Sequence, residues 1–155
     1  MDRGTEILLE AVCGEGLKGS LLDLGCGVGV VAVICTKLFQ TETYAVDINP
    51  RAVELTQLNS AGNGVQVDAF VSDGFASVDR PFDTVLTNPP IRAGKAVIYR
   101  MFEDAKTHLN PGGALYAVIR RKQGAESALR KLEEVFGNCT VAARDKGYWV
   151  LKSVV

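Results

Sequence analysis

The most constraining feature of the sequence is the stretch from Leu21 to Gly29, which reads Leu-Leu-Asp-Leu-Gly-Cys-Gly-Val-Gly. An apolar run ends there in three alternating glycines and passes at once into a segment with helical character. This order predicts a buried parallel strand, a glycine turn and a helix N-terminus, by which α/β folds bring backbone close to a nucleoside cofactor. The spacing D-x-G-x-G-x-G differs from the G-x-G-x-x-G of dinucleotide dehydrogenases. Taken alone, the stretch fits a cofactor loop and a structural strand-to-helix turn about equally well.

Length and composition restrict the class of protein. The chain has 155 residues, and we expect a single domain over residues 1–155 with a substantial core. An apolar content of 47% and a charged content of 23% are typical of a soluble globular protein. Because the net charge is -1, any nucleic-acid contact needs a local basic patch. No apolar run approaches the ~20 residues that span a bilayer, and the start Met1-Asp2-Arg3-Gly4 does not resemble a signal peptide.

The cysteines give no indication of a metal site. Cys13, Cys26, Cys35 and Cys139 show neither a C-x-x-C pair nor a Cys/His spacing typical of zinc. We expect them to be small buried apolar residues of a cytoplasmic protein, in a reducing compartment.

The hydrophobic pattern predicts alternating strands and helices. Predicted strands cover residues 20–24, 43–46, 65–71, 82–86 and 114–119, and predicted helices cover 5–13, 28–38, 51–59, 95–109 and 124–136. Two further strands, 139–143 and 148–152, close the chain as a hairpin. Five strand–helix-like units followed by a hairpin indicate a doubly wound, Rossmann-like α/β fold. We expect a seven-stranded, mostly parallel sheet with an antiparallel C-terminal hairpin strand.

Polar or glycine residues follow each of the first four predicted strands. In chain order they are Gly25, Gly27 and Gly29, then Asp47, then Asp73 and Gly74, then Asn88-Pro89-Pro90. Ligands of open parallel sheets bind beyond the carboxyl ends of the strands, so these residues are expected at one site.

Two acidic residues of this set, and Asp23 within the first strand, have different expected roles. Asp47 suits a ribose diol, and its alternative role is an acid at the start of a helix. Asp73 suits an adenine amine, and its alternative is an Asp-Gly turn. Asp23, within the first strand, either anchors the loop or meets the amino group of a cofactor.

The order of these motifs resembles that of class I S-adenosylmethionine-dependent methyltransferases. The branch of that family with Asn-Pro-Pro methylates nitrogen in planar systems, either exocyclic amines of bases or the glutamine amide. The chain is more closely similar to the small-subunit ribosomal RNA guanine-N2 methyltransferases, over essentially its whole length. That resemblance is carried by Asp2-x-Gly4-Thr5-x-x-Leu8-Leu9, Asn88-Pro89-Pro90, Leu109-x-Pro111-Gly112-Gly113, Gln123-Gly124-Ala125 and Lys146-Gly147-Tyr148. Members usually carry further sequence before the Asp2-x-Gly4-Thr5 region.

The resemblance implies S-adenosylmethionine as the cofactor and no metal. The implied cofactor-binding residues are Thr5, Asp23, Gly25, Cys26, Gly27, Gly29, Asp47, Ile48, Asp73, Gly74 and Asn88. The implied catalytic residues are Asn88, Pro89, Pro90 and Ile91. The side-chain oxygen of Asn88 and the carbonyl of Pro89 would accept hydrogen bonds from the target amine, and the prolines would hold both acceptors rigid. Ile91 departs from the family pattern, because most members have Tyr or Phe there to stack on the target base.

Basic residues follow the fourth and fifth predicted strands. The candidates for contact with ribosomal RNA or the small ribosomal subunit are Arg92, Lys95 and Arg100, then Arg120, Arg121 and Lys122. Their alternative role is that of ordinary solvated cations. His108 is expected to stabilise a helix C-terminus, and Trp149 is expected in the core.

Two other functions stay open. The same Asn-Pro-Pro chemistry serves protein-glutamine N-methyltransferases, and a cofactor-binding module without catalysis is also compatible with the motifs. A nicotinamide dehydrogenase is disfavoured by the glycine spacing.

Overall fold

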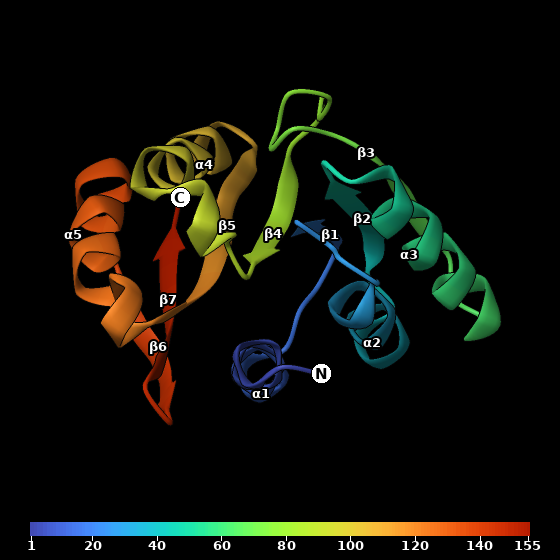
Figure 1. The fold of residues 1–155 in the computed structure, drawn as a ribbon, viewed down its shortest axis with the longest axis horizontal. Coiled ribbons are helices and arrows are strands. Elements are labelled where there is room, and N and C mark those ends of the chain that lie inside the picture. The colour runs from blue at the N-terminus through green and yellow to red at the C-terminus, as the bar shows by residue number, and fades with distance from the viewer.

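The computed structural model describes all residues, 1–155. Seven strands form one sheet in the order β3-β2-β1-β4-β5-β7-β6 (Figure 1). The strands are β1 (Ser20–Leu24), β2 (Glu42–Asp47), β3 (Val67–Val71), β4 (Phe82–Thr87), β5 (Leu109–Arg120), β6 (Thr140–Asp145) and β7 (Tyr148–Val154). Strands β1 to β5 pair in parallel, while β7 pairs antiparallel with both β5 and β6. The predicted fold class is therefore confirmed.

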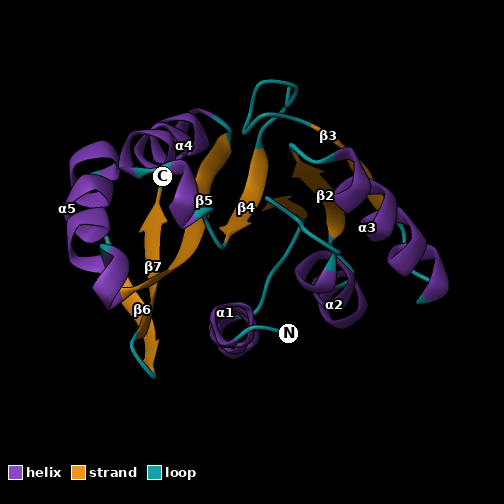
Figure 2. Cartoon of the chain, in the orientation of Figure 1, coloured by secondary structure: helices purple, strands orange, loops and turns teal.

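Five helices cover both faces of the sheet (Figures 1 and 2). They are α1 (Arg3–Glu15), α2 (Val30–Phe39), α3 (Pro50–Gly62), α4 (Lys95–Thr107) and α5 (Ala125–Phe136). Helices α1 to α3 pack on one face and helices α4 and α5 on the other, and each face buries its own apolar cluster. Strand β1 is buried along its whole length because helices cover both of its faces. The strand order reverses between β1 and β4, which marks the position where doubly wound sheets bind ligands.

No helix lies between β3 and β4, where residues 72–81 form turns, in agreement with the predicted helices. The connection before β5 differs from the prediction. Helix α4 ends at Thr107, and β5 begins at Leu109 and runs through Pro111 and Gly112, which the sequence predicted as a turn. Pro111 fits there because the β4–β5 register shifts between Phe82 and Thr84, where the missing N–H is tolerated.

Some side chains also lie where the pattern did not predict them. The hydrophobic pattern of this segment predicts that Val53, Leu55 and Leu58 of α3 face inward. Leu58 is instead exposed, while Thr56 and Ser60 face inward with Val53. Of the four cysteines, Cys26 and Cys35 are buried as expected, but Cys13 is exposed and Cys139 is half-buried. Trp149 is also half-buried and packs against the edge of the core.

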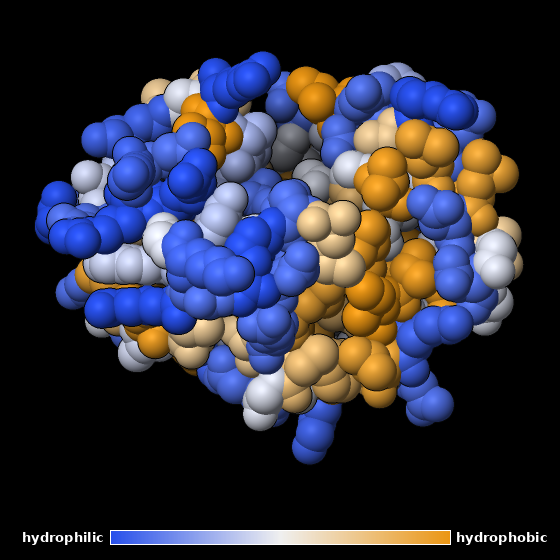
Figure 3. All heavy atoms as spheres, turned by 60° about the horizontal axis from the view of Figure 1, so that its bottom comes forward, coloured by the Kyte–Doolittle hydropathy of each residue, from blue (hydrophilic) through white to orange (hydrophobic).

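Helix α2 leaves an apolar stripe on the surface. Viewed from the side of α1 and α2, apolar residues gather on one half of the molecule and hydrophilic residues on the other (Figure 3). Leu38 of α2 and Val28, which precedes this helix, are exposed, and Val30 and Ile34 are only partly buried. No helix of the chain combines the length and the apolar character that crossing a membrane requires.

Candidate active site

A cavity of about 830 Å³ lies at the carboxyl ends of β1 to β4, within the size range of small-molecule sites. Its walls include residues that follow each of these four strands, in agreement with the convergence predicted from the sequence. The predicted site residues among them are Gly25, Asp47, Ile48, Asp73, Gly74, Asn88 and Pro90.

The glycine loop after β1 is held from two sides. The backbone N–H groups of Gly25 and Cys26 both donate to the carbonyl of Val46, each at 2.9 Å, which ties the loop to β2. The hydroxyl of Thr56 in α3 donates to the carbonyl of Gly27 at 3.0 Å. Gly25 and Gly27 have φ of 79° and 56°, and a Cβ on either would meet no atom within 4 Å. The loop is thus held in place by these hydrogen bonds, while the positions of Gly25 and Gly27 leave open space for a ligand beside the backbone.

The side chain of Asp47, at the end of β2, also holds the glycine loop in place. One carboxylate oxygen accepts from the backbone N–H of Gly27 and the other from that of Asn49, both at 3.0 Å. Each carboxylate oxygen has a second lone pair, so Asp47 can also accept hydrogen bonds from a ligand in the cavity that it lines.

Asp73 and Gly74 form the neighbouring wall. The carboxylate of Asp73 is exposed, and the turn that carries it is held by Ser72. The hydroxyl of Ser72 donates to the carbonyl of Gly74 at 2.7 Å and accepts from the N–H of Ser77 at 3.0 Å. This turn explains why Asp73 lies beside the cavity although no helix follows β3.

Asp23 is a buried acid within β1, just before the glycine loop, and it is not part of the cavity wall. It is only 4% exposed, and its Oδ2 has no hydrogen-bond partner. Burial raises the pKa of this carboxyl to about 7, the backbone of Ala32 opposes the rise, and the charge of Asp47 adds to it. An unsatisfied buried carboxylate is stabilised by a cationic N–H donor nearby. The carboxylate acceptors Asp23, Asp47 and Asp73 therefore match the donors of S-adenosylmethionine, which has an ammonium group, a ribose diol and an adenine amine.

Asn88 stands where β4 ends, beside the N-terminus of α1. Its Nδ2 points toward Oδ1 of Asp2 and Oγ1 of Thr5, each at 3.5 Å. Asp2 itself is the N-cap of α1 and accepts from the N–H of Thr5 at 2.8 Å. Because the amide nitrogen of Asn88 faces Asp2 and Thr5, its side-chain oxygen is free to accept a hydrogen bond. Thr5 therefore contacts Asn88 but is not part of the cavity wall.

Other predicted residues lie outside the cavity wall. Sγ of Cys26 is 3.3 Å from the hydroxyl of Thr56, and burial raises the pKa of this thiol to about 11. A Cβ on Gly29 would lie 2.9 Å from Cγ2 of Thr56, so Gly29 allows the loop to pack on α3. Pro89 is buried and Ile91 is partly buried against the core. For these residues the predicted roles toward ligands stay predictions.

The wall formed by α4 was not predicted from the sequence, which indicated Arg100 only as a candidate for RNA contact. The cavity is lined by four residues on one side of α4 and by its C-cap residue, together with Phe75; they are Val97, Arg100, Met101, Asp104 and His108. Their helical spacing directly after Asn-Pro-Pro was the available signal.

His108 was expected only at a helix C-terminus, which it does cap. Its ring also stacks on Phe75, with 4.6 Å between centroids, and its Nε2 lies 3.1 Å from the carbonyl of Val78. It therefore joins α4 to the turns between β3 and β4.

The predicted basic residues lie in two groups along this edge. Arg92, which follows β4, and Lys95, the first residue of α4, are exposed. Arg120, Arg121 and Lys122, at the end of β5 and directly after it, are also exposed. Arg121 pairs with Glu126 at 2.9 Å. Of all six candidates, Arg100 lines the cavity. Their contact with RNA stays a prediction.

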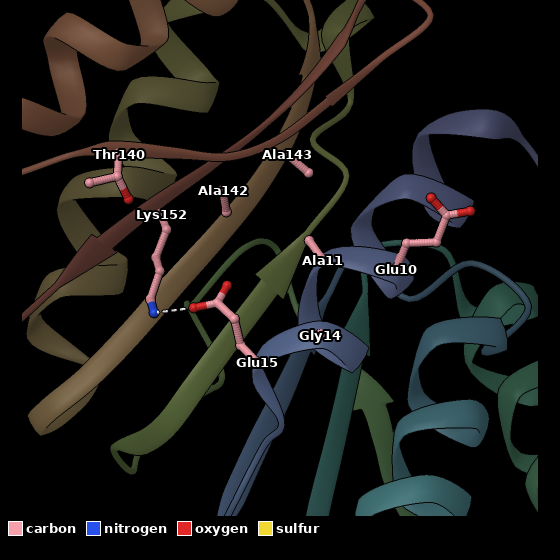
Figure 4. A pocket seen from close by; sticks show the side chains of 8 residues that line it. All are labelled: Glu10, Ala11, Gly14, Glu15, Thr140, Ala142, Ala143 and Lys152. Carbon is pink, nitrogen blue, oxygen red and sulfur yellow. Dashed lines mark hydrogen bonds and ion pairs between the residues drawn. The ribbon is translucent and has the colours of Figure 1, made fainter.

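A second hollow of about 480 Å³ lies between the C-terminal part of α1 and the β6–β7 hairpin (Figure 4). Lys152 and Glu15 form an ion pair of 2.6 Å in it. None of the predicted site residues lines this hollow, so the larger cavity is the candidate active site.

Comparison with known proteins agrees with this assignment. A family model described as methyltransferase small domain matches residues 1–152. The uncharacterised protein YbxB of Bacillus subtilis (strain 168) is 41% identical over 157 residues, which cover 99% of this chain and 78% of YbxB. Ribosomal RNA small subunit methyltransferase C of Shewanella loihica is 33% identical over 96% of this chain and 43% of its own length.

A solved structure is similar over the whole chain. It is the T. thermophilus 16S rRNA N2 G1207 methyltransferase (RsmC) in complex with AdoMet and guanosine, with a TM-score of 0.89 and 27% identity. The match covers 99% of this chain and 43% of that one, so this chain spans less than half the length of the two named methyltransferases. The chain therefore belongs to the methyltransferase small domain family, a family of S-adenosylmethionine-dependent enzymes, and it has the Rossmann-like fold predicted from its sequence.

Proposed function

We propose that this protein transfers the methyl group of S-adenosylmethionine to the N2 amine of a guanine in small-subunit ribosomal RNA. The observation that carries the proposal is the position of Asn88 at the cavity, with its amide nitrogen turned toward Asp2 and Thr5. The relatives named ribosomal RNA small subunit methyltransferase C support the choice of RNA. Such a substrate belongs to the cytoplasm, where ribosomes are assembled.

Four groups of residues would hold the cofactor. Asp47 would accept from the ribose hydroxyls, Asp73 and Gly74 would meet the adenine, and Gly25 would let the methionyl part approach the backbone. The carboxylate of Asp23 would balance the ammonium group, directly or through the loop. When bound, S-adenosylmethionine supplies an electrophilic methyl group on a sulfonium leaving group.

Asn88 and Pro89 would activate the acceptor. The lone pair of the guanine amine is delocalised into the ring, which makes this nitrogen a poor nucleophile. The Asn88 side-chain oxygen and the Pro89 carbonyl, each accepting from one N–H, favour a pyramidal nitrogen with its lone pair directed at the methyl group. Because two prolines fix these acceptors, no reorganisation is needed during the reaction. A base in a helix must first be unstacked.

Methyl transfer to immature small-subunit ribosomal RNA, or to subunits, tests the proposal. We expect labelled S-adenosylmethionine to yield N2-methylguanosine in nucleoside digests. Asn88→Ala should lower kcat by roughly 10²- to 10³-fold, since one preorganised acceptor is lost, while the dissociation constant for S-adenosylmethionine changes little. Asn63→Ala, at the exposed end of α3, is the matched control and should retain parental kcat.

Two results would contradict the proposal. One is label in a base other than guanine or in the glutamine of a release factor. The other is an Asn88→Ala variant that methylates RNA at the parental rate.

A further inference from the structure

An unstacked base needs a planar surface to rest on, and the residue after Asn88-Pro89-Pro90 does not provide one. Proteins hold splayed bases mainly by stacking them on aromatic rings or on Arg guanidinium planes. Ile91 is aliphatic, and it is partly buried against the core on the side of α4 and α5. Any aromatic contact to a base at Asn88 must therefore come from another part of the chain.

The fold brings the ring of Tyr148 close to Asn88. Tyr148 is the first residue of β7 and pairs with Arg120 at the end of β5, so it lies at the same edge of the sheet as the cavity. Gly4 in the first turn of α1 separates the two side chains. A Cβ on Gly4 would lie 3.1 Å from Cε1 of Tyr148 and 3.2 Å from Nδ2 of Asn88. Both side chains are thus within contact distance of one point.

Arg120 extends this surface. Its guanidinium lies 5.5 Å from the centre of the Tyr148 ring, a cation–π arrangement. Arg120 is exposed and Tyr148 is half-buried, so the pair is accessible at the edge where RNA would approach. The next residue, Trp149, lies on the other face of the sheet. Trp149 packs against the apolar cluster of α4 and α5, whereas Tyr148 packs against the cluster of α1, on the side of Gly4.

We propose that Tyr148, stacked with Arg120, is the specificity-determining residue that holds the target base beside Asn88. The inference rests on the proposed function, since it assumes a base as the methyl acceptor. Gly4 has a matching role, because any side chain there would push Tyr148 or Asn88 out of place. A planar base gains from this surface, whereas a glutamine amide offers no ring to stack. The terminal hairpin therefore contributes to substrate choice, although it is far from Asn88 in the sequence.

Replacing the ring tests the inference. With small-subunit ribosomal RNA as substrate, Tyr148→Leu should raise KM for RNA about tenfold or more, the loss expected for one base–aromatic stack. Tyr148→Phe should stay close to the parent, because it keeps the ring. The dissociation constant for S-adenosylmethionine should be unchanged in both variants. Tyr99→Leu on α4 is the matched control for loss of a half-buried tyrosine and should leave KM for RNA at the parental value.

A fluorescence measurement keeps the test independent of the stability of the leucine variant. The chain has one tryptophan, so Tyr148→Trp in a Trp149→Phe background places a single indole at the proposed contact. Guanosine, added with S-adenosylhomocysteine, should quench its emission. An unquenched indole, or a Tyr148→Leu variant with parental KM for RNA, overturns the inference while the proposed function stands if the parent still forms N2-methylguanosine. A parent protein that methylates no base overturns both.

Discussion

At the scale of single residues, Asp23 imposes a structural cost on the ligand-free protein. It is nearly fully buried in β1, and one of its oxygens has no partner. Burial without a full set of hydrogen bonds destabilises the ionised form, which explains the rise of its pKa to about 7. A residue that costs stability in the ligand-free protein is typical of binding sites.

We predict that Asp23→Asn stabilises the cofactor-free protein at high pH. The unfolded carboxyl ionises near 3.8, whereas the folded carboxyl ionises at about 7. As pH rises from about 4 to 7, the unfolded chain releases this proton first, so Asp23 lowers the free energy of unfolding progressively, and fully above pH 7. The advantage of the Asn variant should grow over this window, toward a limit of roughly 4 kcal/mol. Urea unfolding at pH 4.5 and pH 8 measures it, and an equal difference at both pH values would contradict the prediction.

At the scale of elements, the loop from Gly25 to Gly29 shows how glycines of one motif differ in purpose. Gly25 lines the cavity and has open space around its Cβ position. Gly29 instead has φ of 90°, and its Cβ position is 3.1 Å from Cα of Thr56. The first glycine leaves room for a ligand, and the second lets α3 approach the loop.

Alanine substitutions at Gly25 and at Gly29 should therefore affect ligand binding and stability differently. Gly29→Ala should lower the free energy of unfolding by about 2–4 kcal/mol, because backbone strain and a steric clash add. Gly25→Ala should cost only about 1–2 kcal/mol from strain, but it should weaken S-adenosylmethionine binding, since the new methyl group enters the cavity. Urea unfolding and calorimetric titration distinguish the two effects. Equal destabilisation in both variants would show that the Thr56 contact is unimportant.

Elements were predicted well where the pattern is local. Strand β1 has the predicted bounds, because its apolar run is flanked by clear turn residues. The start of β5 was missed, since Asn110-Pro111-Gly112 has the composition of a turn and becomes a strand only through its pairing with β4. Leu58 was assigned to the wrong side of α3 because the exposed face of that helix is not uniformly polar.

At the scale of the whole molecule, the net charge of -1 makes any RNA binding depend on local charge. Arg92, Lys95, Arg120, Arg121 and Lys122 are exposed along one edge of the sheet, beside the cavity. RNA binding through such a rim releases counterions and is therefore strongly salt-dependent.

We predict that affinity for ribosomal RNA falls steeply with salt. If about four phosphates are contacted, affinity should drop roughly 50-fold between 50 and 200 mM salt. Lys122→Gln should reduce the slope of log K against log salt by about 0.7. Lys37→Gln, at the far end of α2, should leave the slope unchanged. Filter binding over a salt series measures both slopes, and a flat dependence in the parent would exclude the rim as the contact surface.

The sequence alone determined the fold class, the succession of strands and helices along the chain, and the edge of the sheet where Gly25, Asp47, Asp73 and Asn88 meet. It could do so because apolar periodicity and turn chemistry are local properties of the chain. Tertiary structure decided which side chains complete the site, because each of these contacts joins segments far apart in sequence. It buried Asp23 without a partner, and it brought α4 to the cavity and Tyr148 beside Gly4 and Asn88.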